Sequence, residues 1–196
     1  MTAWPAYDPT HRALRVPPRL VAPAPPEGWT LGALGAPVFS IVVYGTPPPQ
    51  GSKKPEGKFR KKTKAGTVVT IPRMVESAQD AIDAWRDAFD KACRLVLPRG
   101  WVPLDAPLIA DMTFTLKKPV NAPNTRLTWP MRYPDLDKLA RATGDALSLA
   151  KVYKDDARIV EYRTLAKRYP GEGPDALRKP GAVVRLWILP GAEVTR

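Results

Sequence analysis

The segment from Tyr133 to Asp156 constrains the fold of this chain more than any other, because it places a helix-forming stretch between two pairs of acidic residues. Pro134 disfavours a helix at the residue before it, so the chain that enters Asp135 is expected to be extended. In an extended chain, residues two apart point to the same side, which would bring the carboxylates of Asp135 and Asp137 together. Asp137 is also suited to cap the helix that follows.

After this helix, Asp155 and Asp156 fall in a turn before a strand. The turn could return a third carboxylate to the first two, and oxygen ligands of this kind suit Mg²⁺. A purely structural interpretation also stays open, because aspartate is common at helix N-caps and in turns. Asp137, Arg141 and Asp145 have the four-residue spacing of an exposed ion-pair stripe.

These acids occur in a strongly basic chain. Its 31 Lys and Arg residues against 19 Asp and Glu give a formal net charge of +12, and the pI is about 10.0. A basic surface attracts a polyanion such as nucleic acid, whereas a cluster of carboxylates repels it. The two are compatible if a divalent cation lies between the carboxylates and a phosphate. The combination indicates a metal-dependent nuclease.

The counts of cysteine and histidine exclude several other classes. Cys93 is the one cysteine, so an intramolecular disulfide and a cysteine-rich zinc site are excluded, and we expect it in a helix core. His11 is the one histidine and lies in a proline-rich stretch, which excludes an HNH nuclease or a Ser-His-Asp triad built from the folded part. The chain contains no apolar stretch of 18 residues, so we expect a soluble protein that does not bind a membrane.

A strongly basic stretch follows the first expected strand, residues 38–44. It carries Lys53, Lys54, Lys58, Arg60, Lys61, Lys62 and Lys64, opposed only by Glu56. Gly57, Gly66 and a short β-prone run indicate a hairpin or a mobile loop. Beside a nuclease site these side chains are expected to grip phosphates, although such a run is more often a solvated loop. Phe59 could contact bases or could pack within the protein.

The remaining pattern predicts an α+β fold in the order β, β-hairpin, α, β, α, β, β, with two main helices on a mixed, largely antiparallel sheet. A helix from Ser77 to about Leu97 is expected to be capped by Ser77, and residues 108–117 alternate like a strand with one buried face. Residues 1–36 contain seven prolines and are predicted to form a flexible extension. Residues 37–196 are predicted to form a single compact domain.

The sequence PDLDKLARATGDALSLAKVYKDDARIVEY, residues 134–162, resembles the signature of RusA-type Holliday junction resolvases (crossover junction endodeoxyribonucleases) of phages and prophages. That signature is approximately D-L-D-N-L-x-K-x-x-x-D-A-L, followed by a short turn with D-D. The upstream sequence GTPPPQGSK, residues 45–53, resembles the start of the same family. The resemblance extends over residues 39–189.

The resemblance implies that Asp135, Asp137 and Asp156 coordinate a divalent metal, Mg²⁺ with Mn²⁺ as a substitute. It leaves the roles of Asp145 and Asp155 open. The family's essential lysine is replaced by Arg141, which is always charged and suited to hold phosphate but not to transfer a proton. The family's asparagine is replaced by Lys138, which adds a further positive charge for DNA. Asp135, Asp137, Arg141 and Asp156 are therefore the expected catalytic residues.

The resemblance further implies a homodimer that acts on branched DNA, a four-way junction, in the cytoplasm of a bacterial or phage-infected cell. The expected reaction is phosphodiester hydrolysis at two symmetric positions, which needs two active sites related by a two-fold axis. Two alternatives stay open. One is a less selective branched-DNA or flap endonuclease, and the other is an inactive DNA-binding protein, which the change to Arg141 would favour.

Overall fold

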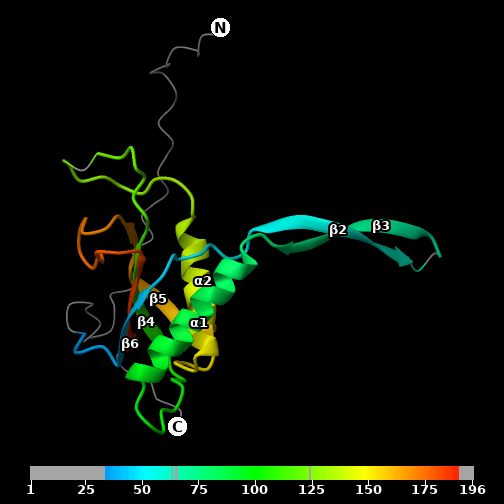
Figure 1. Ribbon diagram of the computed structural model, residues 1–196. Coiled ribbons are helices and arrows are strands. Elements are labelled where there is room, and N and C mark those ends of the chain that lie inside the picture. Colours follow the sequence, from blue (N-terminus) through cyan, green and yellow to red (C-terminus); the bar gives the residue numbers. More distant parts are fainter. Residues whose placement is uncertain (1–33, 63, 65, 124, 190–196) are drawn as a thin grey trace, which may run out of the picture.

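The two layers of the main body are a four-stranded sheet and a pair of helices on one of its faces (Figure 1). The computed structural model describes residues 34–62, 64, 66–123 and 125–189. Its elements are β1 (Phe39–Tyr44), β2 (Lys53–Lys62), β3 (Val68–Glu76), α1 (Gln79–Val96), β4 (Leu108–Thr115), α2 (Leu136–Leu149), the 3-10 turn η2 (Asp156–Arg158), β5 (Ile159–Arg168) and β6 (Gly181–Ile188). This order confirms the predicted α+β fold. The proline-rich extension predicted for residues 1–36 lies almost entirely outside the described residues.

The sheet has the strand order β1-β6-β4-β5. Strand β6 runs antiparallel to both β1 and β4, whereas β4 and β5 are parallel. A parallel pair needs a crossover connection, and α2 supplies it here. The predicted mixed, largely antiparallel sheet is confirmed. The crossover places α2 against the sheet, and both the N-terminus of α2 and the turn after it are exposed.

Strand β4 departs from the prediction that only one of its faces is buried. All eight of its residues are buried, because β4 lies between β6 and β5 and its second face is covered as well. The polar side chains on that face are paired in the interior: Asp111 accepts from Arg163, and the Thr115 hydroxyl accepts from the backbone N–H of Leu177 at 2.9 Å. Alternation alone could not reveal this covering layer.

The sequence of helix α1 predicts an apolar stripe at three- to four-residue spacing, from Ala78 to Val96. Ile82, Trp85, Phe89 and Cys93 of that stripe are buried, whereas Val96 is half exposed. The rings of Trp85 and Phe89 meet edge to face at 5.1 Å, and Trp85 Nε1 donates to Thr143 Oγ1 of α2 at 3.2 Å. Burial raises the pKa of the Cys93 thiol to about 12, which makes it a core residue and not a nucleophile. The predicted Ser77 cap is wrong, since the N-cap is Ala78 without a side-chain cap bond.

Strands β2 and β3 pair only with each other and form a ribbon that extends away from the body (Figure 1). We call residues 53–76 the arm. Every residue of β2 is exposed, so the arm adds little to the apolar core. Its two ends meet at its base, where the N–H of Ser77 donates to the carbonyl of Ser52 at 2.7 Å. This confirms the hairpin that the glycines and the β-prone run predicted.

Within the described residues, no helix is both long and apolar enough to cross a bilayer.

Candidate active site

One face of α2 gathers several of the residues that the sequence singled out. Asp137, Arg141 and Gly144 are spaced by four and three residues, so they lie above one another on the same side of the helix. Asp156 joins them from η2: a Cβ atom placed on Gly144 would lie 3.5 Å from Asp156 Cβ and 3.8 Å from its Oδ2. We call Asp137, Arg141, Gly144 and Asp156 the acidic face.

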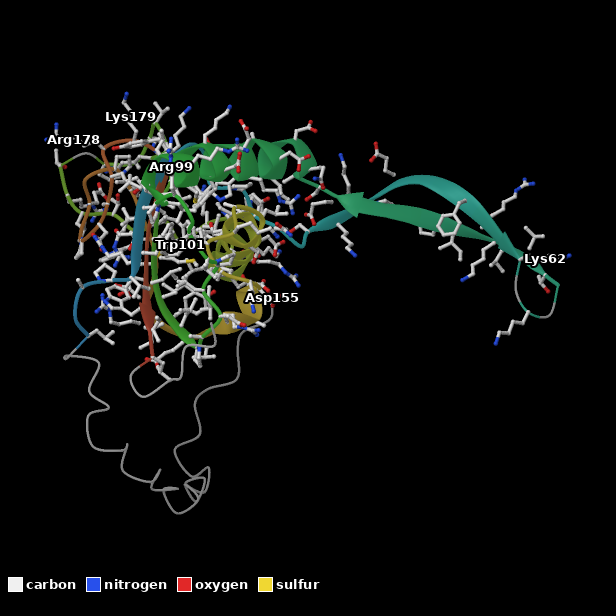
Figure 2. All side chains as sticks on the ribbon, turned by 90° about the horizontal axis from the view of Figure 1, so that it is seen from below. Lys62, Arg99, Trp101, Asp155, Arg178 and Lys179 are labelled. Atoms are coloured by element: carbon white, nitrogen blue, oxygen red, sulfur yellow. The ribbon has the colours of Figure 1, made fainter. Side chains whose placement is uncertain are left out.

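The turn after α2 separates the roles of the two neighbouring aspartates. Asp155 is the N-cap of η2, and its Oδ1 accepts from the N–H of Ala157 at 2.9 Å. Figure 2 shows Asp155 on the body of the molecule, away from the arm. Asp156 is the first residue of η2 and lies against α2. The structure therefore gives Asp155 a structural role as the cap of η2.

Two phenol groups lie near the Asp156 carboxylate. Burial, followed by the charges of Tyr162 and Asp156, raises the pKa of Tyr153 far above its usual range. Burial and then the charge of Asp156 also raise the pKa of Tyr162. The Tyr153 hydroxyl donates to the carbonyl of Gly144 at 2.9 Å. Both phenols stay neutral at physiological pH, so neither adds a second negative charge beside Asp156.

Asp135 lies at the start of α2 and not in a strand with Asp137. It is the N-cap, with the extended angles φ −71° and ψ 143°, and the helix begins at the next residue. The predicted extended entry is confirmed, but Asp137 is wrong as the cap because it lies in the first helical turn. The two-residue alternation therefore does not apply to this pair.

Lys138 forms an ion pair with Asp135, with Nζ and Oδ2 2.9 Å apart. The hydrogen bond to Asp135, followed by the charges of Asp135 and Asp137, raises the pKa of Lys138. An exposed pair of this kind contributes little stability because water screens it. Lys138 thus places a positive charge beside Asp135 and near Asp137 of the acidic face.

Arg141 lies close to a tight turn of the chain at Gly51. Gly51 has φ +100°, and a Cβ atom added there would lie 3.0 Å from Arg141 Nη1. The guanidinium of Arg141 has no hydrogen bond or ion pair to any other described residue. Its donors are free, and a guanidinium fork suits a phosphate group.

The carboxylates provide the ligand chemistry of a hard divalent cation but do not form a closed cage. Asp135, Asp137 and Asp156 are exposed and offer only oxygen atoms, which suits Mg²⁺ or Mn²⁺. In the part of the chain that the structure describes, no group of three or more His, Cys, Asp or Glu side chains is arranged to hold a metal ion. The structure brings Asp156 to the same helix face as Asp137, while Asp135 lies at the helix start.

The predicted DNA-binding lysines and arginine lie on the arm, apart from Lys138 on α2. The pairing of β2 with β3 has a register shift between Pro55 and Lys58 and is regular from Lys58 to Lys62. In this regular part, the side chains lie on two faces of the ribbon. Because opposite residues in an antiparallel pair share a face, the cross-strand partners place Lys58, Arg60 and Lys62 together on one face, with Pro72, Thr70 and Val68. Phe59 and Lys61 lie on the other, opposite Ile71 and Val69. Figure 2 shows Lys62 near the tip of the arm.

Sequence reasoning missed several residues that position the site. Lys167 of β5 donates to the carbonyls of Arg132 at 2.8 Å and Pro134 at 2.9 Å, and so holds the chain that enters Asp135. Gln50 donates to Asp145, and Arg86 lies 3.8 Å from the same carboxylate. These contacts join residues far apart in sequence and have no local signal. Gly144 did have a local sequence signal. Glycine inside a helix destabilises it by about 1 kcal/mol relative to alanine, so its presence there indicates a structural constraint.

A comparison with protein families gives one match. The family model described as Endodeoxyribonuclease RusA matches residues 48–176, which is 129 of 196 residues. The matched range includes the arm, both helices and every residue of the acidic face. A comparison with curated proteins finds no match.

Proposed function

Because the chain belongs to the RusA endodeoxyribonuclease family, we propose that it is a metal-dependent, structure-specific endodeoxyribonuclease that resolves four-way DNA junctions. The observation that carries this proposal is the acidic face. Asp156 lies on the side of α2 that also bears Asp137 and Arg141, so carboxylates and an unpaired guanidinium share one surface. Carboxylates alone would repel a phosphodiester, and Arg141 with a bound cation would reverse that local repulsion.

Asp135, Asp137 and Asp156 are the residues that would hold one or two Mg²⁺ or Mn²⁺ ions. When bound, such an ion lowers the pKa of a water molecule and neutralises charge that develops on the phosphate. Arg141 holds the scissile phosphate and stabilises the pentacoordinate transition state as the 3′-oxygen leaves. Lys138, beside Asp135, contributes a further positive charge to this surface.

The arm supplies the grip on DNA. Residues 53–76 carry eight basic and two acidic residues, a net charge of +6 out of the formal +12 of the chain. The ten residues of β2 span about 33 Å at roughly 3.3 Å per residue, close to the ~34–36 Å of one turn of duplex DNA. Lys58, Arg60 and Lys62 share a face and span about 13 Å of the strand at roughly 3.3 Å per residue. They can therefore contact neighbouring phosphates, which makes binding steeply dependent on salt.

A junction has two-fold symmetry, and cutting it into two duplexes requires two nicks at related positions. We therefore propose that the protein acts as a homodimer with one acidic face per subunit. Each arm would hold one duplex branch while the acidic face of the same subunit acts on the strand near the branch point.

The proposal is tested by cleavage of a labelled synthetic four-way junction with Mg²⁺ or Mn²⁺, alongside matched duplex and flap substrates. Paired symmetric nicks that disappear with EDTA are expected. Asp137→Asn is expected to abolish cleavage and to keep junction binding, because its carboxylate is exposed in the first turn of α2. Equal cleavage of flaps and junctions would indicate a less selective nuclease, and tight binding without cleavage in either metal would indicate an inactive binder.

A further inference from the structure

Gln50 and Asp145 are joined across the base of the arm, and we propose that they form a positioning pair that couples DNA binding by the arm to the placement of Arg141. This inference rests on the proposed nuclease function and assigns a role to two residues outside the expected metal ligands. Gln50 lies in the connection between β1 and β2, three residues before the arm begins. Asp145 lies on α2, one residue beyond Gly144.

Gln50 attaches to α2 at two points, one on each side of Arg141. Its backbone N–H donates to the carbonyl of Lys138 at 3.1 Å, and its side-chain Nε2 donates to Asp145 Oδ2. Residues 138 and 145 are seven apart, or about 10.5 Å along a helix at 1.5 Å per residue. The connection therefore lies along two turns of α2, with Arg141 between its two attachment points.

The next residue explains why this path needs glycine. Gly51 has φ +100° and comes so close to Arg141 that a Cβ atom would lie 3.0 Å from Nη1. A side chain at this position would be strained by the backbone and would push the guanidinium away. Gly51 therefore forms one wall of the site in which Arg141 rests, and any shift of the Gln50 attachment would move that wall.

The same connection also contacts the C-terminal end of the arm, at the base. The N–H of Gly51 donates to Glu76 Oε2 at 3.0 Å, and the N–H of Ser77 donates to the carbonyl of Ser52 at 2.7 Å. Both ends of the arm thus meet at residues 51–52, directly beside Gln50. A continuous series of contacts leads from the arm through Gln50 to α2 and Arg141.

Asp145 is engaged in this series and does not belong to the acidic face. Its carboxylate accepts from Gln50 and lies 3.8 Å from Arg86 Nη2 of α1. The side chain is 32 % exposed, so the pair is only partly screened by water. Gln50 Oε1 is buried without a hydrogen-bond partner in the described structure. The Gln50 amide is therefore held through its Nε2 contact with Asp145, and removing that contact should free the connection.

The test measures junction affinity and single-turnover cleavage separately. Gln50→Ala is expected to lower the cleavage rate at saturating enzyme roughly tenfold, the scale of a hydrogen bond to a charged group, while the Kd for the junction changes less than twofold. Gln50→Glu should lower the rate further, because it opposes two carboxylates. Gln50→Glu combined with Asp145→Asn restores a hydrogen bond with donor and acceptor exchanged and keeps a carboxylate near Arg86, so the rate should recover.

Asp87→Asn is the matched control. Asp87 is an exposed acid of α1 that pairs with Lys91 at 2.6 Å, so its substitution should leave cleavage unchanged. A wild-type rate in Gln50→Ala would overturn the positioning role while leaving the nuclease function intact. Parallel losses of affinity and rate without rescue in the double variant would show a structural role and would also overturn it. Failure of the wild-type protein to cleave any junction would remove the proposed function, and this inference with it.

Discussion

At the scale of single residues, Gly144 determines how near Asp156 can come to α2. A Cβ atom at this position would meet Asp156 Cβ at 3.5 Å and the Tyr153 hydroxyl at 3.7 Å, which are ordinary van der Waals distances. The space therefore admits one methyl group but nothing larger. Glycine at position 144 therefore weakens α2 but allows Asp156 of η2 to come close to the helix.

We predict opposite effects for two substitutions of Gly144. Gly144→Ala should raise the free energy of unfolding by up to about 1 kcal/mol through helix propensity and should leave cleavage nearly unchanged. Gly144→Leu should displace Asp156 and lower cleavage at least tenfold while junction binding persists. Denaturant unfolding and junction cleavage measure the two effects, and equal cleavage by both variants would contradict the role of Gly144 in placing Asp156.

The guanidinium of Arg141 makes no hydrogen bond or ion pair with the other described residues, and the proposed function assigns it to the phosphate. Arg141→Ala should lower the single-turnover cleavage rate by roughly 10²–10³-fold, the typical effect of removing one transition-state donor. Arg141→Lys should keep much more activity, because a lysine retains the charge but not the fork. If both variants cleave at the wild-type rate, Arg141 takes no part in the chemistry.

At the scale of elements, the arm that we propose to bind DNA lies outside the folded body. Replacing Lys58, Arg60 and Lys62 together by serine removes three charges from one face. Junction binding should weaken. The slope of log Kd against log salt concentration should become less steep by about three, because each lost phosphate contact lowers the slope by about 0.9. The thermal unfolding temperature should hardly change, because the three side chains are exposed.

The matched control for the arm is the double variant Arg178→Ser and Lys179→Ser. Figure 2 shows both residues at the opposite end of the molecule from Lys62. The control removes charge without touching the arm, so the salt slope should stay close to that of the wild type. A similar change of slope per charge in both variants would mean that net charge, and not the arm, controls binding.

The sequence could predict the elements better than their contacts. The stripe of α1 and the hairpin produce local patterns, so both were predictable from spacing alone. The burial of both faces of β4 was not predictable, because the partners of its second face come from far along the chain. Leu177, for example, donates to Thr115 from 62 residues away. At the site, the sequence indicated the acids, but the link between Gln50 and Asp145 spans 95 residues and depends on how α2 packs. Local periodicity contains no information about such pairs.

At the scale of the whole molecule, stability should depend on the carboxylate that anchors the turn bearing Asp156. Asp105 accepts from Lys154 and from Arg158 Nε at 2.7 Å. The hydrogen bonds from Lys154 and Arg158 hold the pKa of Asp105 below its ordinary value of 3.8. The stabilisation is therefore fully present above pH 3.8 and is lost as the pH falls through the lowered value.

Asp105→Asn should accordingly lower the unfolding temperature at pH 7, and the difference from wild type should shrink toward zero in strong acid. Thermal unfolding followed between pH 7 and pH 2 measures this, with Asp87→Asn as an exposed control. A difference that stays constant over the whole range would mean that the Asp105 charge contributes nothing.

The proposed dimer is also a property of the whole molecule. The chain has a mass of 21.6 kDa, so light scattering should give twice that, about 43 kDa, with free protein and with two subunits per junction. Mixing wild-type subunits with Asp137→Asn subunits should yield junctions nicked on one side only. Paired nicks from such mixed dimers would show that one subunit can supply both cuts.

The arm is an insertion whose two ends meet, because Ser52 and Ser77 are joined by a hydrogen bond at its base. Its residues could be exchanged, lengthened or shortened without rebuilding the body, since a change confined to the ribbon leaves the apolar core intact. Changes in the arm could therefore alter the proposed DNA contacts without disturbing the proposed active site, provided that the path through residues 50–52 is kept. Evolution could therefore replace the arm, whereas the base that joins the arm to α2 would have to be kept.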